Sequence, residues 1–203
     1  MSNRPRRGRA YRLGPAVVRL AFLREASVPM RDIAMRVLQR ISDATGETAH
    51  LGQLQGSRLA TLAYTYSSTH GVAVRMEDAD VVPLHASASG HAMLAFAAPD
   101  FRDRILAGPL PAFTPDTPVA PDDIRACLTR VRATGLAELI GGFEADVHSL
   151  AVPLFDGNAI VTGAIAVAAP AARMTPALRA RVIAALRDGA REIMEQSGGT
   201  PPQ

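Results

Sequence analysis

The sequence predicts an α+β domain in which helices flank a mostly antiparallel sheet. Strand-like segments joined by short turns occur twice, over 47–67 and over 147–169, and hairpins of this kind build antiparallel sheets. Segments with helical spacing of apolar residues precede, separate and follow the two hairpins. A chain of 203 residues can fold without disulfides, and its single cysteine, Cys127, excludes an intramolecular one.

The first part of the chain is predicted to be a basic arm followed by two amphipathic helices. Five arginines lie within residues 1–14, and such an arm either contacts nucleic acid or serves as a solubilising terminus. Apolar residues then recur at helical spacing over 15–26 and over 30–41, and Ser27 is placed to cap the second helix. We therefore assign 15–46 to linker and packing helices.

The middle of the chain changes from helical to strand-like spacing and back. The hairpin over 47–67 is followed by a third predicted strand over 71–76. Short helices are expected over 90–97 and 101–107. Five prolines within residues 108–121 then predict an irregular loop.

The last third of the chain carries the same kinds of signal, with capping residues at helix starts and glycine at a helix end. In chain order we expect a helix capped by Asp122 or Asp123 and ended by Gly135, strands over 147–155 and 159–169, a helix from Thr175 to about Gln196, and a frayed tail over 198–203.

Composition disfavours several classes of function. The five histidines are scattered, and the sequence has no paired metal-ligand motif and no Walker or Rossmann glycine pattern, so we expect neither metal nor cofactor. Aromatic residues make up 4% of the chain, which disfavours stacking platforms for single-stranded nucleic acid. No apolar segment follows the basic start, and the longest apolar run, 159–172, is too short for a bilayer. We expect a cytoplasmic protein that does not contact a membrane.

The segment PLHASASGHAMLAF, residues 83–96, contains two histidines and two serines close together in the sequence. One interpretation is a nucleophile, with Ser87 or Ser89 activated by His85 or His91. Neither serine lies in the G-x-S-x-G pattern of a nucleophile elbow, which weakens this interpretation. We expect no catalytic residue here.

The same segment also fits an anion site. A helix that starts near Ser89–Gly90 has unpaired backbone N–H groups in its first turn, at the positive end of its dipole. The small residues 86–90 would let a carboxylate or phosphate approach that backbone. Helix capping by Ser87 or Ser89 explains the same residues equally well. Physical chemistry alone therefore favours neither the anion site nor simple capping.

Several motifs in a fixed order connect the chain to a known family. They are YRLG (11–14), ATGETAHL (44–51), PLHASASGHAMLAF (83–96), FTPDT (113–117), RVRATGL (130–136), and VHSLAVPLFDGN with AIAVAAP (147–158 and 164–170). With these motifs the chain resembles the effector-binding domain of IclR-family transcriptional regulators. The resemblance implies a GAF-like effector domain over 47–197, in which a curved antiparallel sheet surrounds a small-molecule pocket. It also implies assembly into a homodimer or tetramer.

The resemblance further implies a site for a small organic acid, whose carboxylate would be held by the backbone at the start of the pocket helix. The implied effector-binding residues are Val82, Leu84, Ala88, Ser89, Gly90, Leu139, Val147, Ser149, Ala166 and Ala168.

This chain departs from the family pattern at several of these positions. The family usually has lysine where His91 stands, cysteine at Ser149, and serines in the best-known members at Ala166 and Ala168. An acidic residue is also common in the family near Leu139. We therefore expect a mostly apolar far wall, on which each unpaired polar group of a ligand would cost about 1–3 kcal/mol. This favours an acid with an apolar or aromatic body over one the size of glyoxylate.

In the family, YRLG follows an N-terminal winged helix-turn-helix, and here it begins at residue 11. We therefore expect the chain to contact DNA only through a module that it does not itself contain. The leading interpretation is the effector-sensing and oligomerisation domain of a transcriptional regulator, allosterically coupled to DNA binding. The alternatives are a standalone small-molecule-binding adaptor that acts on a protein partner, and a small Ser/His hydrolase.

Overall fold

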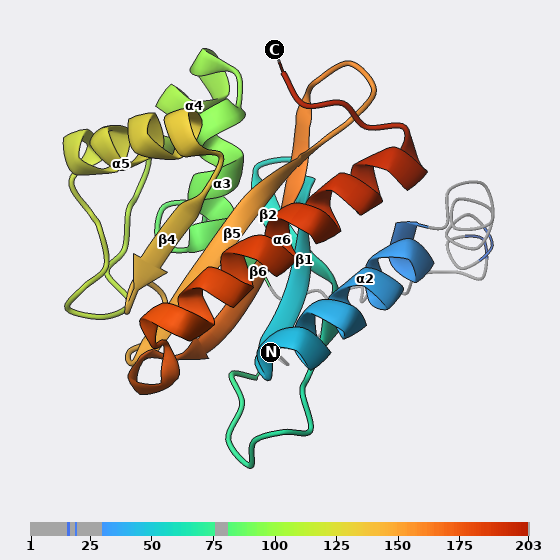
Figure 1. Cartoon of the computed structure of the whole chain (residues 1–203). Coiled ribbons are helices and arrows are strands. Elements are labelled where there is room, and N and C mark those ends of the chain that lie inside the picture. Colours follow the sequence, from blue (N-terminus) through green and yellow to red (C-terminus); the bar gives the residue numbers. More distant parts are fainter. Residues whose placement is uncertain (1–15, 17–18, 20–29, 76–80, 203) are drawn as a thin grey trace, which may run out of the picture. The chain divides into compact units, whose positions relative to one another are not determined.

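A six-stranded antiparallel sheet forms the centre of the computed structural model, which describes residues 16, 19, 30–75 and 81–202 (Figure 1). The predicted first helix and the Ser27 cap therefore lie outside the described residues, apart from two single positions. The strand order is β3-β2-β1-β6-β5-β4, which confirms the predicted α+β class. The strands are β1 (Thr48–Gln55), β2 (Arg58–Thr65), β3 (Val81–Val82), β4 (Ala137–Ile140), β5 (Val147–Phe155) and β6 (Val161–Pro170).

Both predicted hairpins are present, and one long-range pairing joins them into a single sheet. The turn between β1 and β2 contains Gly56, whose φ of 64° suits a residue without a Cβ. β1 then pairs with β6 along most of its length, so that His50 lies opposite Ala166 and Thr48 opposite Ala168. This pairing brings residues from the first and last thirds of the chain side by side.

Two helices cover one face of the sheet (Figure 1). α2 (Met30–Thr45) ends at Gly46, and α6 (Pro176–Ser197) is capped by Thr175, whose hydroxyl accepts a hydrogen bond from the Leu178 amide at 3.2 Å. They approach closely at Gly189, where an added Cβ would lie 2.8 Å from side-chain carbons of α2. Neither these nor any other helix in the described ranges is long and apolar enough to cross a membrane.

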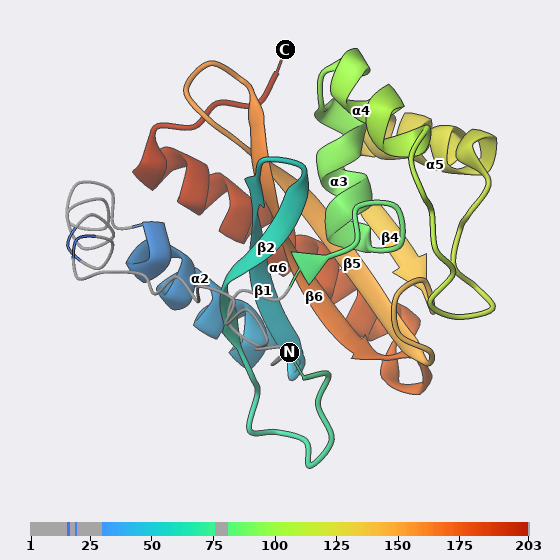
Figure 2. The same ribbon diagram turned by 180° about the vertical axis from the view of Figure 1, so that it is seen from behind.

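The opposite face of the sheet carries α3 (Ala88–Phe96), α4 (Pro99–Leu106) and α5 (Pro121–Thr134) (Figure 2). α3 lies directly on the sheet, and its residues from Ala88 to Ala95 are all buried. Buried side chains from α3, α5 and the sheet form one core on this side. The proline-rich loop over 108–120 connects α4 to α5, as predicted.

Three local predictions were wrong. Residues 71–75 form a loop and not a strand; the third strand is the two-residue β3. The carbonyl groups of Val72 and Val74 accept hydrogen bonds from side chains instead of from a neighbouring strand. Neither aspartate caps α5, because Ala120 is the capping residue and Asp122 and Asp123 lie in the first turn.

The third wrong prediction is an omission, because no strand was predicted over residues 137–140, which form β4, the edge strand beside β5. At the other end of the chain, the first three residues of the predicted frayed tail are anchored, beginning with Gly198, whose amide donates to the Met194 carbonyl as the cap of α6. The Gly199 amide donates to the Met194 carbonyl at 2.7 Å, and the Thr200 amide donates to the Asp156 carbonyl at 3.0 Å.

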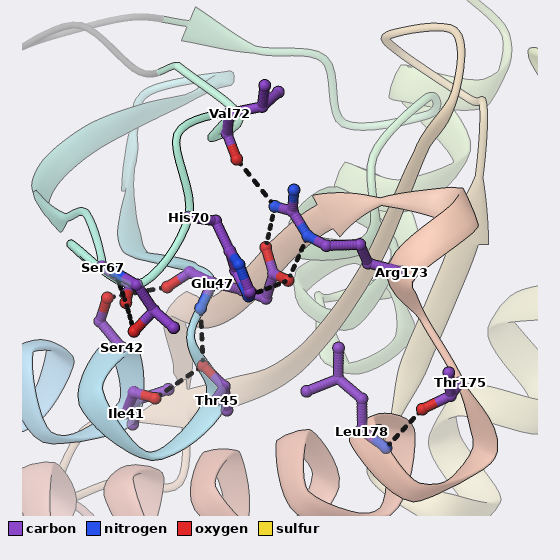
Figure 3. A network of polar contacts seen from close by, with 11 residues as sticks. Ile41, Ser42, Thr45, Glu47, Ser67, His70, Val72, Arg173, Thr175 and Leu178 are labelled. Carbon is purple, nitrogen blue, oxygen red and sulfur yellow. Dashed lines mark hydrogen bonds and ion pairs between the residues drawn. The ribbon is translucent and has the colours of Figure 1, made fainter.

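A buried ion pair fixes the start of β1 (Figure 3). The side chain of Glu47 is 1% exposed, and both of its oxygens accept hydrogen bonds from Arg173, at 2.8 and 2.6 Å. Arg173 also donates to the Val72 carbonyl at 2.9 Å, and the Ser42 hydroxyl donates to the Glu47 carbonyl at 2.8 Å. Because Arg173 belongs to the short helix η1 (Ala171–Arg173) after β6, this cluster ties the end of α2, β1, β6 and the 66–75 loop together.

Candidate functional site

A cavity of about 50 Å³ lies at the N-terminal end of α3, bounded by β1, β5, β6 and the loop between β4 and β5. It is formed by residues from five separate parts of the chain. The lining residues are His50, Val74, Ala86, Ser87, Ala88, Ser89, Gly142, Phe143, Glu144, Val147, Ser149 and Ala168. The predicted effector-binding residues that it brings together are Ala88, Ser89, Val147, Ser149 and Ala168.

The first turn of α3 contains both features that the sequence had left as alternatives. Ser87 is the capping residue: its hydroxyl accepts from the Gly90 amide at 3.0 Å and donates to the Pro83 carbonyl at 2.6 Å. The Ser87 carbonyl accepts from the His91 amide at 2.9 Å. The amides of Ala88 and Ser89 remain without an acceptor inside the helix. Two N–H donors at the positive end of the helix dipole therefore belong to residues of the cavity wall.

His50 provides an unusual polar group in this wall. Its Nε2 atom lies 3.2 Å from the Ser89 hydroxyl oxygen. Its Nδ1 atom is buried and has no hydrogen-bond partner among the described residues. Burial lowers the pKa of His50 from 6.5 to about 4, because a charged imidazolium is poorly solvated in the interior. At neutral pH the ring is therefore uncharged, with one N–H donor and one acceptor nitrogen.

The wall opposite α3 is held in place by the proline-rich loop. The Thr117 hydroxyl donates to the Gly142 carbonyl at 2.7 Å, and the Thr114 hydroxyl donates to the Gly141 carbonyl. The rings of Phe113 and Phe143 meet edge to face, with centroids 5.0 Å apart. These contacts position Gly142, Phe143 and Glu144 over the cavity.

The other predicted site residues lie outside the cavity lining. Val82, Leu84 and Ala166 belong to the hydrophobic core, and Leu139 lies in β4 and packs against that core. Gly90 cannot offer its amide to a ligand because Ser87 already accepts from it. Its lack of a Cβ serves packing instead, since an added Cβ would lie 2.2 Å from the Leu84 carbonyl oxygen.

Sequence reasoning missed several residues of the lining. They are His50, Val74, Gly142, Phe143 and Glu144, whereas Ala86 and Ser87 were expected at the anion site but not among the ten effector-binding residues. Polar groups share the far wall with its apolar residues: the His50 imidazole, the Glu144 carboxylate and the Ser149 hydroxyl belong to the lining. His50 stands in one of the family motifs, but only the pairing of β1 with β6 places it beside α3.

The hydrolase interpretation loses its predicted base. His85 Nε2 lies 3.0 Å from the Pro111 carbonyl oxygen, and His91 Nε2 lies 2.7 Å from the His85 carbonyl oxygen. Ser89 does contact a histidine, His50, but no carboxylate within the described ranges orients that ring, as a catalytic triad requires. In the same ranges, no three His, Cys, Asp or Glu side chains are grouped to hold a metal ion.

A second, larger groove lies between α5, β4 and α6, with a volume of about 590 Å³. Arg130, Arg179 and Arg187 are among its lining residues. Arg179 donates to both oxygens of Glu138, at 2.7 and 2.6 Å, and this pairing lowers the pKa of the Glu138 carboxyl. The groove contains His91 but none of the ten predicted site residues.

The comparison with protein families decides the identity of the domain. The family model described as the C-terminal domain of the bacterial transcriptional regulator IclR matches residues 25–195. The chain belongs to the IclR family. The similarity extends over both hairpins, α3 and the whole cavity described above.

IclR-type relatives include the Pca regulon regulatory protein of Pseudomonas putida, which is 29% identical over 195 residues, 95% of this chain and 67% of that protein. The regulator BhcR of Paracoccus denitrificans is 31% identical over 188 residues, 91% of this chain and 66% of that protein. The chain thus spans about two thirds of the length of these relatives. They are transcriptional regulators, which confirms the prediction that the chain is not an enzyme.

Solved IclR structures share the fold. A protein assigned to the IclR regulators from Silicibacter sp. TM1040 is 53% identical, with a TM-score of 0.92 over 95% of this chain and 76% of that one. An IclR homologue from Microbacterium hydrocarbonoxydans, in complex with 4-hydroxybenzoate, is 27% identical, with a TM-score of 0.79 over 91% of this chain and 75% of that one. These neighbours confirm the predicted effector-domain fold.

Proposed function

We propose that this domain binds a small organic acid with an apolar or aromatic body, in the cytoplasm, as the effector of an IclR-type regulator. The single observation that carries the proposal is the pair of Ala88 and Ser89 amides at the start of α3, which have no acceptor in the helix and belong to the cavity wall. Backbone donors at a helix N-terminus are a well-known way of holding a carboxylate.

The rest of the lining supports a hydrophobic body for this acid. Apart from the donors and the polar side chains of His50, Glu144 and Ser149, the lining offers the ligand apolar surface from Val74, Val147, Ala168 and the ring of Phe143. Among the described residues the lining has no arginine and one carboxylate, that of Glu144, so the helix end is the main source of positive potential. The binding of 4-hydroxybenzoate by the Microbacterium homologue is consistent with an aromatic carboxylate.

We also propose that the loop containing Val74 transmits effector binding from the cavity to α2. Val74 lines the cavity, and its carbonyl accepts from the Thr48 hydroxyl at 2.8 Å. The same loop is held by Arg173, which binds Glu47 beside the end of α2. A ligand that displaces Val74 would shift this loop and bias the position of α2. In the whole regulator, such a bias would couple effector binding to DNA binding.

The proposed assembly is a homodimer or tetramer, in line with the family resemblance of the chain. In an oligomer, effector binding can change the arrangement of subunits as well as that of one domain. Sedimentation velocity at tens of micromolar should show a dimer or a larger species. A monomer at that concentration would contradict this part of the proposal.

Calorimetry with a panel of acids tests the function. We expect benzoate and 4-hydroxybenzoate to bind more tightly than pyruvate and glyoxylate. Ala168→Leu fills the cavity and should weaken binding more than tenfold, a loss of over about 1.4 kcal/mol. The matched control, Ala180→Leu, adds the same atoms to an exposed position of α6 and should leave binding unchanged. Tighter binding of the short acids, or equal binding by both variants, would contradict the proposal.

A further inference from the structure

His50 is a buried polar residue with an unused hydrogen-bonding atom. The residue is 5% exposed, and Nδ1 has no partner among the described residues. Buried polar atoms in proteins are nearly always paired, and an unpaired one costs about 1–3 kcal/mol. Two other buried atoms share this condition, the hydroxyl oxygens of Thr61 and Thr65. Of the three residues, only His50 lines the cavity.

The position of the ring relative to the proposed carboxylate site is set by Ser89. Its amide is one of the two first-turn donors that have no acceptor within α3, and its hydroxyl oxygen lies 3.2 Å from His50 Nε2. One residue therefore links the carboxylate position to the imidazole. An acid held by these amides would bring the substituents of its carbon 2, the carbon next to the carboxylate, close to the His50 ring.

The imidazole is suited to recognising a neutral oxygen substituent. Because burial lowers the pKa of His50 to about 4, the ring is uncharged and offers a directed hydrogen bond instead of an ion pair. When Nε2–H donates to the Ser89 hydroxyl, Nδ1 is an acceptor and matches a ligand hydroxyl. In the other tautomer Nδ1–H is a donor and matches a ligand carbonyl oxygen. Both cases require oxygen at carbon 2 of the acid.

We infer that His50 is a specificity-determining residue, which selects acids that carry a hydroxyl or oxo oxygen on the carbon next to the carboxylate. The inference rests on the proposed function and narrows it from an organic acid to a 2-hydroxy or 2-oxo acid with an apolar body. Within the described residues no group pairs with Nδ1, and an oxygen on carbon 2 of such an acid would supply the missing partner.

Three acids with the same aromatic body separate the possibilities. Phenylacetate has no oxygen on carbon 2, mandelate has a hydroxyl there, and phenylglyoxylate has an oxo group. We expect calorimetry on the wild-type chain to show one of the oxygenated acids binding about three- to tenfold more tightly than phenylacetate, the value of one neutral hydrogen bond. The better of the two identifies the tautomer. A fourth acid, 4-hydroxyphenylacetate, has its hydroxyl at the far end and should gain nothing from His50.

Two variants of His50 test its role. In His50→Leu the ratio of affinities between the preferred acid and phenylacetate should fall to about one, while phenylacetate itself binds within about threefold of wild type. In His50→Asn, whose amide lies near the position of Nδ1, part of the preference should return. Circular dichroism establishes that each variant is folded. If His50→Leu does not fold, the inference is tested by the affinity ratios of the wild type and of His50→Asn for the oxygenated acids relative to phenylacetate.

The outcomes separate this inference from the proposed function. Acids that bind the wild type with no preference for oxygen at carbon 2, or with a preference that survives in His50→Leu, overturn the inference and leave the proposed function standing. Absence of binding by every acid overturns both. Loss of the preference in His50→Leu, together with its partial return in His50→Asn, supports the inference, because a merely structural role would weaken all four acids alike.

Discussion

Glu47 and His50 lie three residues apart in the chain, both buried and both polar, and their surroundings differ sharply. Both oxygens of Glu47 are bound by Arg173, and its backbone carbonyl accepts from Ser42 (Figure 3). His50 uses one nitrogen on Ser89 and leaves the other without a partner. A complete set of partners marks a structural polar group, whereas an incomplete one at a cavity marks a place for a ligand.

The difference also extends to charge. Hydrogen bonds to Glu47 raise the pKa of Arg173, so the guanidinium stays charged inside the cluster. Burial without a charged partner has the opposite effect on the imidazole and keeps it neutral. The Glu47–Arg173 ion pair thus holds structural elements together, whereas the uncharged His50 ring offers hydrogen-bonding atoms to a ligand.

The largest change in stability is expected from removing the buried ion pair between Glu47 and Arg173. Arg173→Ala removes both hydrogen bonds to the buried Glu47 carboxylate and leaves only the His70 ring near it, with Nε2 4.0 Å from Oε1, so the free energy of unfolding should fall by about 3 kcal/mol. The matched control is Arg179→Ala. Arg179 binds both oxygens of Glu138 in the same way, but these two side chains are 43% and 28% exposed. The control should lose less than about 1 kcal/mol. Urea unfolding of both variants measures this, and equal losses would contradict the contrast.

The neutral histidine predicts a stability that depends on pH. The folded-state pKa of His50, about 4, lies below the unfolded value of 6.5. As pH falls through this window the unfolded chain binds the proton first, so the free energy of unfolding should decrease by about 3 kcal/mol between pH 6.5 and 4. His50→Leu should remove this part of the slope. The slope that remains includes His91, whose pKa is also lowered by burial. Identical pH profiles for wild type and variant would contradict the assignment.

A smaller effect separates the two roles that glycine could have at the start of α3. Gly90→Ala places a Cβ against the Leu84 backbone and should destabilise the fold by about 1–3 kcal/mol. Gly71→Ala is the control, because an added Cβ there meets no atom within 4 Å. Thermal unfolding of the two variants distinguishes them. If Gly90→Ala is as stable as Gly71→Ala and only loses acid binding, Gly90 belongs to the ligand site after all.

The smallest effect concerns two alanines of β6 that face the same side of the sheet. Ala168 lines the cavity, so Ala168→Ser should weaken an apolar acid by about 0.5–2 kcal/mol. Ala166 lies in the core, so Ala166→Ser should lower stability and leave the affinity of the folded protein unchanged. Calorimetry and thermal unfolding on both variants give the comparison. Equal changes in affinity would show that the cavity extends along β6 to Ala166.

Local signals in the sequence predicted the hairpins and most helices. The turn at Gly56 and the cap at Thr175 are formed by neighbouring residues, so their chemistry is readable without the fold. The segment 71–75 alternates like a strand, but hydrogen bonds from the distant Thr48 and Arg173 occupy its carbonyls. Such competition is invisible in a local pattern.

The candidate site was predictable only in part. The small residues before α3 indicated an anion site, and Ala88 and Ser89 are in the cavity wall. The capping by Ser87, which removes the Gly90 amide, was the equal alternative and also occurs. His50 could not be placed, because it reaches α3 through the pairing of β1 with β6, and no property of residues 44–51 determines which strand lies beside them.

The most direct test of the account is to follow the backbone amides of α3 by NMR while an aromatic acid such as mandelate is added. We expect the Ala88 and Ser89 amide signals to move together and to saturate with the dissociation constant given by calorimetry, while the Gly90 amide, already bound to Ser87, moves less. Saturating shifts confined to the groove around Arg130 and Arg187, with the start of α3 unchanged, would contradict the account.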